Sequence, residues 1–213
     1  MQTKKQKKIS KRKKHLLTIV GALIIYAGIC IVGYKYYHNY NSQKIEEQQI
    51  DEFYEIQEEI IHEEVEEQEE VKESNVEVYR EPYIAVLKID KIGLQRGMYN
   101  INSKNNNVNR NIQILKGSDM PDIDKGNLMM AGHSGNGYSA YFRNLPKLDK
   151  GDIATIIYNG KTYSYKLTKS YEIEKTGSAV ISKNKDKTTL TLITCKHNTN
   201  KQIVFIFELE NIF

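Results

Sequence analysis

Two residues in this sequence have the types and the setting for thiol chemistry, a cysteine and a histidine that each follow a short apolar run. Cys195 directly follows the run 188–194, and His133 follows the run 127–131. The second cysteine, Cys30, lies inside a long uncharged stretch. A thiol becomes an effective nucleophile when a base or a positive group stands beside it. Cys195 with His133 is therefore the candidate pair, and an inert buried Cys195 is the alternative.

The other histidines and the common motifs offer less. His197 lies two residues after Cys195 on an apparent loop, where a solvated histidine is expected. Gly132-His133-Ser134-Gly135-Asn136 lacks the last glycine of a G-x-S-x-G nucleophile elbow. The sequence contains no GxGxxG, P-loop or HExxH motif. Two cysteines are too few for a disulfide scaffold or a cysteine-rich zinc site.

The elements that must position this pair are expected to be short β-strands. Asn159-Gly160 between two alternating runs is a strong hairpin signal. Many short runs within about 138 residues favour an all-β barrel or sandwich. A helix is expected around 138–145, and a second is considered near 107–114. The strand-like runs are 83–89, 112–115, 127–131, 153–158, 161–167, 170–173, 188–194 and 202–209.

A charge-free stretch of nineteen residues, Leu16–Tyr34, predicts a membrane-spanning helix. At about 1.5 Å per residue it extends about 28 Å, close to a hydrocarbon core of about 30 Å. Residues 1–14 carry eight Lys or Arg and no acid, so the positive-inside rule places the N-terminus in the cytoplasm. A cleaved signal peptide is the alternative, but the apolar run is long and no small-x-small site follows it. No nucleic-acid partner is expected, because the basic tail is a topology signal.

An acidic segment follows the predicted span. Residues 44–73 carry fourteen Asp or Glu against Lys44 and Lys72, without Gly or Pro. Glu and Gln favour helix, whereas the density of like charge argues against a compact core. We expect a solvated stalk, helical or disordered, that holds the next domain away from the membrane. The predicted organisation is a basic cytoplasmic tail (1–15), an anchor (16–37), the stalk (38–75) and an extracytoplasmic domain (76–213).

The residues around the candidate pair resemble the sortase family. Thr191-Leu192-Ile193-Thr194-Cys195 matches the TLxTC signature, and Ala131–Ser134 matches the segment around the sortase catalytic histidine. Phe142–Leu145 and Leu148–Asp152 resemble the F-x-x-L…L-x-x-GD stretch between them. The order of His before Cys fits, as does their separation of 62 residues. The resemblance covers roughly residues 83–209 and implies an eight-stranded sortase-type β-barrel with one or two short helices.

The resemblance also implies a reaction. Cys195 would attack the Thr–Gly bond of an LPxTG-like sorting signal and form a thioacyl enzyme, and His133 would protonate the leaving amine. An amine acceptor, such as a peptidoglycan precursor or another surface protein, would resolve the thioester. Thr194 would help to hold the substrate. The family implies a single-pass membrane enzyme at a Gram-positive surface, with a hydrolytic cysteine peptidase or an inactive binding module on the same fold as alternatives.

One feature departs from the family pattern. Sortases carry an arginine at the start of the final strand, thought to stabilise the oxyanion or position the substrate. Here the distance to the run 203–205 makes Lys201 the best match and Gln202 the alternative register. Period-2 alternation puts these two on opposite faces, so only one can serve. We expect Lys201, which keeps the charge but lacks the planar fork. Further candidates are Arg96, Arg110 and Arg143, after which no arginine follows.

No cofactor is expected, and calcium is kept as an alternative because some sortases bind it. Asp119, Asp122 and Asp124 lie in the corresponding stretch. They do not match the metal-binding pattern residue by residue, and a solvated turn around Met120-Pro121-Asp122 is the simpler interpretation. The prediction is therefore that no residue serves as a metal ligand. The sequence leaves the class of sortase and the acceptor amine open.

Overall fold

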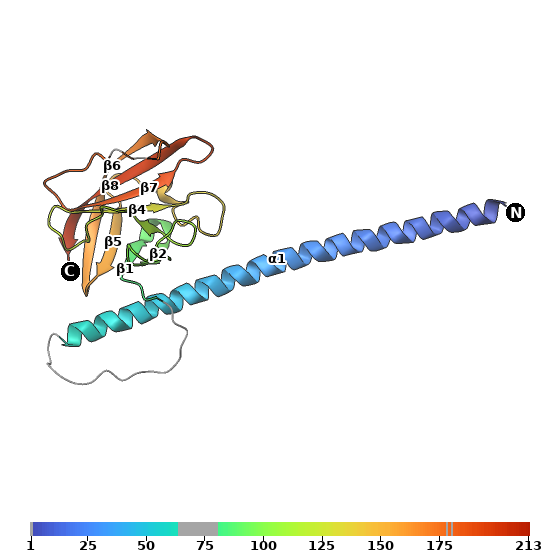
Figure 1. Ribbon diagram of the computed structural model, residues 1–213, viewed down its shortest axis with the longest axis horizontal. Helices are drawn as coiled ribbons and strands as arrows, with labels where there is room; N and C mark the ends of the chain where they lie inside the picture. The colour runs from blue at the N-terminus through green and yellow to red at the C-terminus, as the bar shows by residue number, and fades with distance from the viewer. Residues whose placement is uncertain (1, 64–80, 178, 180) are drawn as a thin grey trace. The chain divides into compact units, whose positions relative to one another are not determined.

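The computed structural model describes residues 2–63, 81–177, 179 and 181–213 (Figure 1). The chain divides into two compact units, Met1–Ile45 and Glu46–Phe213. One α-helix, α1 (Gln2–Glu63), passes through the predicted tail and anchor and continues into the predicted stalk. The absence of proline from this part of the sequence leaves the helical hydrogen bonds uninterrupted.

The apolar part of α1 presents its side chains outward. Leu17, Ile24 and Val32 are 79%, 67% and 68% exposed, although such side chains are normally removed from water. The helix is long and apolar enough to cross a membrane by length and composition. The length and composition of the helix agree with the expected anchor.

The last part of α1 packs onto the second unit instead of standing free. Ile50 and Phe53 are 6% and 3% exposed and form a small core with Tyr83 and Val86. Residues three apart lie on one face of a helix, so these two side chains make a short apolar stripe. The expectation of a fully solvated stalk therefore does not describe residues 46–57, and residues 64–75 of the predicted stalk lie outside the described residues.

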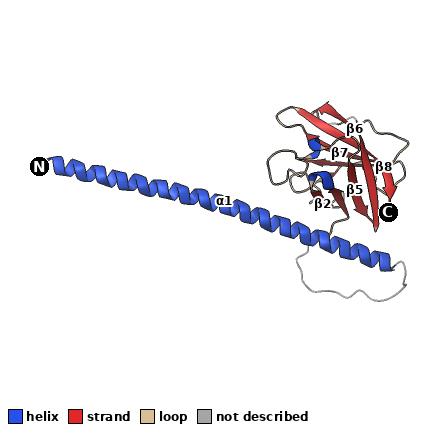
Figure 2. Ribbon diagram, turned by 180° about the vertical axis from the view of Figure 1, so that it is seen from behind, coloured by secondary structure: helices blue, strands red, loops and turns tan. Residues whose placement is uncertain are grey.

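The described strands of the second unit form one sheet of eight strands that curls into a nearly closed barrel (Figure 2). The predicted all-β, eight-stranded barrel is thus confirmed. The order across the sheet is β2-β1-β5-β6-β8-β7-β4-β3. The strands are β1 (Ala85–Ile89), β2 (Leu94–Met98), β3 (Gln113–Ile114), β4 (Asn127–Gly132), β5 (Ile153–Tyr158), β6 (Lys161–Glu174), β7 (Thr189–Cys195) and β8 (Lys201–Ile212).

The short elements differ partly from the expectation. The hairpin at Asn159-Gly160 is present, with φ of 47° and 67° and Tyr158 paired to Lys161. Both angles suit a two-residue type I′ turn. The helix expected around 138–145 is a series of turns followed by the 3-10 helix η2 (Leu145–Lys147), and 107–114 holds turns and β3. A second 3-10 helix, η1 (Asp90–Ile92), joins β1 to β2.

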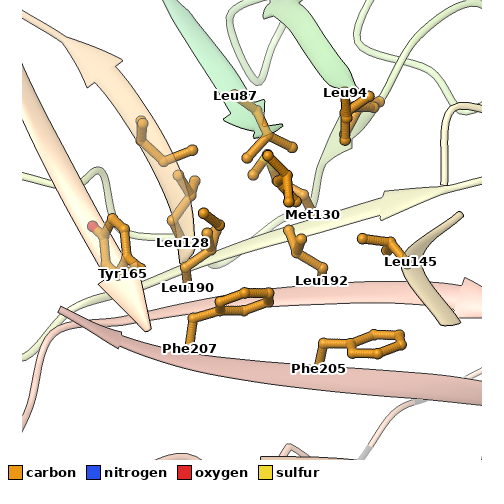
Figure 3. Packing of buried hydrophobic residues seen from close by; sticks show 14 of the residues in the cluster. Leu87, Leu94, Leu128, Met130, Leu145, Tyr165, Leu190, Leu192, Phe205 and Phe207 are labelled. Atoms are coloured by element: carbon orange, nitrogen blue, oxygen red, sulfur yellow. The ribbon is translucent and has the colours of Figure 1, made fainter. Parts of the chain in front are cut away.

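The barrel wall has two apolar faces. Leu190 and Leu192 of β7 point into the main core with Phe205 and Phe207 of β8, as Figure 3 shows. The alternate residues Ile193, Val204 and Ile206 form a separate cluster on the outer face. Because side chains alternate along a strand, each position of β7 and β8 is assigned to the core face or the outer face. This assignment decides where the candidate site lies. The outer cluster is completed by the partly buried Leu115, Tyr171, Ile173, Ala179 and Ile181.

Candidate active site

The pairing of β4 with β7 brings the two candidate residues together. These strands run parallel, with Ala131 opposite Ile193 and Gly132 opposite Thr194 as the last pair. His133 and Cys195 are each the next residue along, so they leave neighbouring strands at the same end of the sheet. Neighbouring strands lie about 4.8 Å apart. Residues 62 positions apart in the sequence thereby become neighbours.

Cys195 belongs to the outer face of the barrel. It is two residues from Ile193, which lies in the outer apolar cluster, and it is half-buried. Extending the β4–β7 register by one residue would put His133 opposite Cys195, on the same outer face. Cys195 thus lies at the end of the buried outer cluster.

Two hydroxyl groups tie the ends of β4 and β7 to each other. Thr194 Oγ1 donates to the carbonyl of Gly132 at 2.8 Å, and Ser134 Oγ donates to the carbonyl of Cys195 at 2.5 Å. The Thr194 side chain is buried, at 2% exposed, and its hydroxyl is engaged within the protein. Thr194 was expected to help hold the substrate. Its side chain instead lies between the two strands and links β7 to β4 through this hydrogen bond.

Removing one of these hydroxyls is expected to loosen the catalytic pair. Thr194→Val keeps the shape but leaves the carbonyl of Gly132 without this donor, which costs about 1–3 kcal/mol when the site is buried. We expect Thr194→Val to lower the free energy of unfolding by that amount, and Ser134→Ala to lower it less because this bond is only partly buried. Urea unfolding of the two variants measures both effects, and an unchanged midpoint for Thr194→Val would contradict the assignment.

The loop after His133 is held from the barrel side. Gly132 packs against Phe142 so closely that a Cβ would come within 2.8 Å of the ring, which explains the glycine before the histidine. The amide of Phe142 donates to the carbonyl of His133 at 3.0 Å. Arg143 donates to the carbonyls of Gly135 and Gly137, at 2.9 and 3.1 Å. The backbone of this loop is therefore fixed on both sides of the imidazole.

The imidazole has a polar partner that the sequence did not single out. His133 Nε2 lies 3.1 Å from Oδ1 of Asn109, in the loop between β2 and β3. This loop holds many asparagines, and nothing in the sequence distinguishes Asn109 from the others. Its role depends on the fold, which brings the loop to the end of β4.

The register of β8 distinguishes the two candidates for the arginine position. Gln202 is paired directly opposite Cys195, and opposite residues of an antiparallel pair share a face. Gln202 also alternates with Val204 of the outer cluster. Lys201 lies on the other face, with its Nζ 3.6 Å from Glu172 and 3.9 Å from Glu174. Gln202, the alternative register, thus shares the face of Cys195, and the expected Lys201 does not.

The lysines around the loop after Cys195 are engaged with Glu172. Lys196 Nζ donates to this carboxylate, and that hydrogen bond, with the charges of Lys196 and Lys201, lowers the pKa of Glu172. These charges gather on the core-side face at the rim of the barrel. They are therefore on the opposite side of the sheet from the thiol.

The arginines considered as replacements have other partners. Arg96 pairs with Glu46 at 2.6 Å, and Arg110 donates to Asn105 at 3.0 Å. Arg143 holds the loop after His133. Each of the three guanidinium groups is thus occupied in positioning backbone or side chains of the domain.

The acidic residues considered for calcium lie at the opposite end of β4 from His133. The carboxylate of Asp119 accepts the amide of Asn127 at 3.0 Å, which closes the turn before β4. Within the described residues, no three His, Cys, Asp or Glu side chains gather as metal ligands. The expected turn around Met120–Asp122 is present, with the amide of Ile123 donating to Met120.

Comparison with known proteins decides the family. The family model of the sortase domain matches residues 87–209, which is more than half of the chain. The chain belongs to the sortase family. Sortases are cysteine transpeptidases, and this chain is one by its family and its fold. No curated protein sequence matches it.

Solved sortase structures share the fold of this sortase at low sequence identity. A Clostridium perfringens sortase D5 transpeptidase has a TM-score of 0.56 and 23% identity, over 79% of this chain and 98% of that one. Sortase A of Listeria monocytogenes has a TM-score of 0.51 and 22% identity, over 61% and 88%. Sortase C2 of group B Streptococcus pilus island 1 has a TM-score of 0.55 and 22% identity, over 63% and 77%. At these identities the likeness establishes the fold alone.

Proposed function

We propose that this sortase is a membrane-anchored transpeptidase that cleaves an LPxTG-like sorting signal between Thr and Gly and transfers the acyl group to an amine. The parallel pairing of β4 and β7 supports this proposal, because its last pair, Gly132 with Thr194, directly precedes His133 and Cys195. The nucleophile is thereby the last residue of β7, and the proton donor is the residue that follows β4. Such a placement keeps reacting groups in a near-attack arrangement.

The reaction has two steps with one thioester between them. In the first, Cys195 Sγ bonds to the Thr carbonyl carbon, the C–N bond to Gly breaks, and His133 gives its proton to the leaving amine. In the second, an acceptor amine attacks the thioester, an amide forms, and the thiolate of Cys195 leaves. His133 takes the proton that the acceptor amine loses, so the site returns to its starting state.

The developing oxyanion needs a hydrogen-bond donor, and Gln202 is the proposed one. Its side-chain amide has two N–H donors and lies on the face of Cys195, directly opposite it. A neutral amide serves as an oxyanion donor in other acyl-transfer sites. It provides no charge, unlike the arginine that the family pattern would place here.

Exchanging Gln202 tests this role against that of Lys201. We expect Gln202→Ala to lower kcat by roughly 10²-fold, the loss typical of an oxyanion donor. Lys201→Ala, the matched control one residue away on the other face, should stay within about twofold, since exposed ion pairs contribute little. Peptide cleavage rates of the two variants measure the difference. A greater loss for Lys201→Ala would return the role to the lysine.

The proposed binding site for the sorting signal lies at the outer apolar cluster. Ile193 and Val204 lie two residues before Cys195 on β7 and two after Gln202 on β8, so the cluster adjoins the thiol. Ala179 and Ile181, in the β6–β7 connection, pack against the same cluster. Ile193 and Val204 are already buried, so an apolar side chain of an extended peptide would pack against the partly buried Ala179 and Ile181.

The N-terminal part is the proposed anchor. The span Leu16–Tyr34, with the basic residues before it, would place the barrel outside the cytoplasmic membrane by the positive-inside rule. Sorting-signal proteins and amine acceptors of the cell wall would be the partners on that side. Protease protection of the barrel in sealed, inside-out vesicles would test the orientation.

The activity itself is tested on the full chain in detergent micelles. Internally quenched LPxTG-type peptides are supplied with and without an oligoglycine acceptor and with and without calcium, and the products are identified by mass spectrometry. Cleavage between Thr and Gly that oligoglycine diverts into an amide supports transpeptidation. Cleavage that ignores the acceptor would indicate a hydrolytic peptidase instead, and a Cys195→Ala variant shows which products need the thiol.

A further inference from the structure

The polar partner of His133 sits on a loop that the protein anchors at several points. This segment, residues 99–112 between β2 and β3, is called here the β2–β3 loop. Asn109 Oδ1, at 3.1 Å from His133 Nε2, is an acceptor, so the contact requires a proton on Nε2. Asn109 is exposed, and water competes for both groups. The contact therefore persists only where the loop holds Asn109 in place.

Asn111 provides the anchor nearest to Asn109. It is fully buried, its Nδ2 donates to the carbonyl of Gly97 at 2.8 Å, and its Oδ1 accepts from Arg96 Nε at 2.7 Å. The Arg96 guanidinium also stacks on the ring of Tyr141, 4.0 Å from its centroid. Tyr141 OH donates to the carbonyl of Arg110 at 3.4 Å, next to Asn109. Arg96 thus contacts both residues that fix the end of the β2–β3 loop.

Arg96 is in turn held by the helix. Glu46 of α1 pairs with Arg96 Nη1 at 2.6 Å, and the two side chains are only 12% and 16% exposed. The carboxylate also accepts the amide of Gly97 at 3.1 Å and the hydroxyl of Tyr83 at 2.6 Å. Burial, with the charge of Glu46, raises the pKa of Tyr83 far above its ordinary value, so this hydroxyl stays a donor. Both carboxylate oxygens of Glu46 are therefore engaged by residues of β2 or by Tyr83 just before β1.

We propose that Asn109 is a positioning residue for the acid His133, and that Glu46 of α1 keeps Asn109 in position through Arg96. The inference rests on the proposed role of His133 and extends it to the helix. The contacts form one continuous series, from Glu46 to Arg96, to Asn111 and Tyr141, and to the β2–β3 loop that carries Asn109. A series of packed and hydrogen-bonded groups of this kind can transmit a displacement, and its coupling is measurable.

The first test needs no substrate. In the full chain labelled with ¹⁵N-histidine, the His133 signals are assigned by their loss in His133→Gln. We expect a protonated Nε2 in the wild type, and a changed Nε2 signal in Asn109→Leu, which keeps the shape but has no acceptor. Asn109→Asp keeps an acceptor oxygen and should retain the protonated Nε2. Glu46→Gln should move the His133 signals, whereas Glu47→Gln, on an exposed neighbour in the same helix, should not.

The second test is kinetic. We expect Asn109→Leu to lower kcat about 3- to 10-fold with KM unchanged, the loss typical of one hydrogen bond, and Asn109→Asp to recover most of it. Glu46→Gln should lower kcat about 2- to 5-fold. The double variant Glu46→Gln, Asn109→Leu should lose no more than Asn109→Leu alone, because the helix then has no contact left to maintain.

The outcomes distinguish the role of Asn109 from that of Glu46. Unchanged His133 signals and kcat in Asn109→Leu overturn the positioning role. A Glu46→Gln variant with a lower melting temperature but unaltered kcat and His133 signals overturns the link to the helix and leaves Glu46 a purely structural residue. If the wild type cleaves no LPxTG-type peptide while its His133 signals respond to Asn109→Leu and Glu46→Gln, the proposed substrate class fails and the inference stands.

Discussion

Replacing Cys195 by alanine is expected to abolish the thioacyl intermediate and to lower the turnover of sorting-signal peptides by at least about 10⁴-fold. The reason is that no other group on the outer face at the end of β7 is a nucleophile in the present arrangement. The neighbouring Thr194 hydroxyl is buried and donates to the Gly132 carbonyl, and the Ser134 hydroxyl donates to the Cys195 carbonyl. Cys30→Ser removes the second thiol of the chain, which lies on α1, and should leave turnover unchanged.

Intact-mass spectrometry of the enzyme mixed with substrate and without an acceptor measures the intermediate directly. The wild type and Cys30→Ser should each gain the mass of the acyl fragment that ends in Thr, and hydroxylamine should release it. Cys195→Ala should gain nothing. An adduct that persists in Cys195→Ala would show that another residue is the nucleophile and would contradict the proposed site.

Replacing His133 by glutamine is expected to lower kcat for amide substrates by about 10²- to 10⁴-fold, the usual contribution of a general acid. Glutamine can still donate a hydrogen bond, but it cannot give a proton to the leaving amine. The deficit should shrink when the Thr–Gly amide is replaced by a Thr ester, because an alcohol leaves with less help from an acid. A rate comparison of the amide and ester substrates, with wild type and variant, measures this difference.

His197→Gln is the matched control for that experiment. His197 is exposed on the loop two residues after Cys195, and the variant should keep the wild-type rate with both substrates. If His133→Gln lost the same factor with ester and amide, His133 would act on the thiol and not on the leaving group. The proposed division of roles would then have to be revised.

Much of the barrel could be predicted from alternation and turn signals. Residues 153–158 and the Asn159-Gly160 turn were placed correctly, because local chemistry determines a two-residue hairpin. The strand Leu94–Met98 was missed, since its run LQRGM contains a charge and a glycine and no clear alternation. It forms because β1 pairs with it in antiparallel fashion. The pairs run from Ala85 with Met98 to Ile89 with Leu94.

The sequence pointed to the candidate pair His133 and Cys195 but not to the residues around it. Alternation showed that Lys201 and Gln202 lie on opposite faces, yet the choice between them depends on which one is paired with Cys195. That register follows from the length of the turn 196–201. In this turn the Lys196 amide donates a hydrogen bond to the Lys201 carbonyl at 2.9 Å. Likewise, Ile50 and Phe53 gave only a weak stripe, because their partners Tyr83 and Val86 come from another part of the chain.

The parallel pairing of β4 with β7 has a consequence for how the chain folds. The antiparallel pairs β1–β2 and β5–β6 join strands close in sequence, whereas β4–β7 must close a loop of 62 residues from Gly132 to Thr194. Closing such a loop costs entropy before its contacts compensate, so non-local pairs tend to form late. Thiol and imidazole therefore meet only near the end of folding. Under the proposed mechanism, a chain that has not yet folded would hold Cys195 without His133 beside it, and we expect it not to be acylated by a sorting signal.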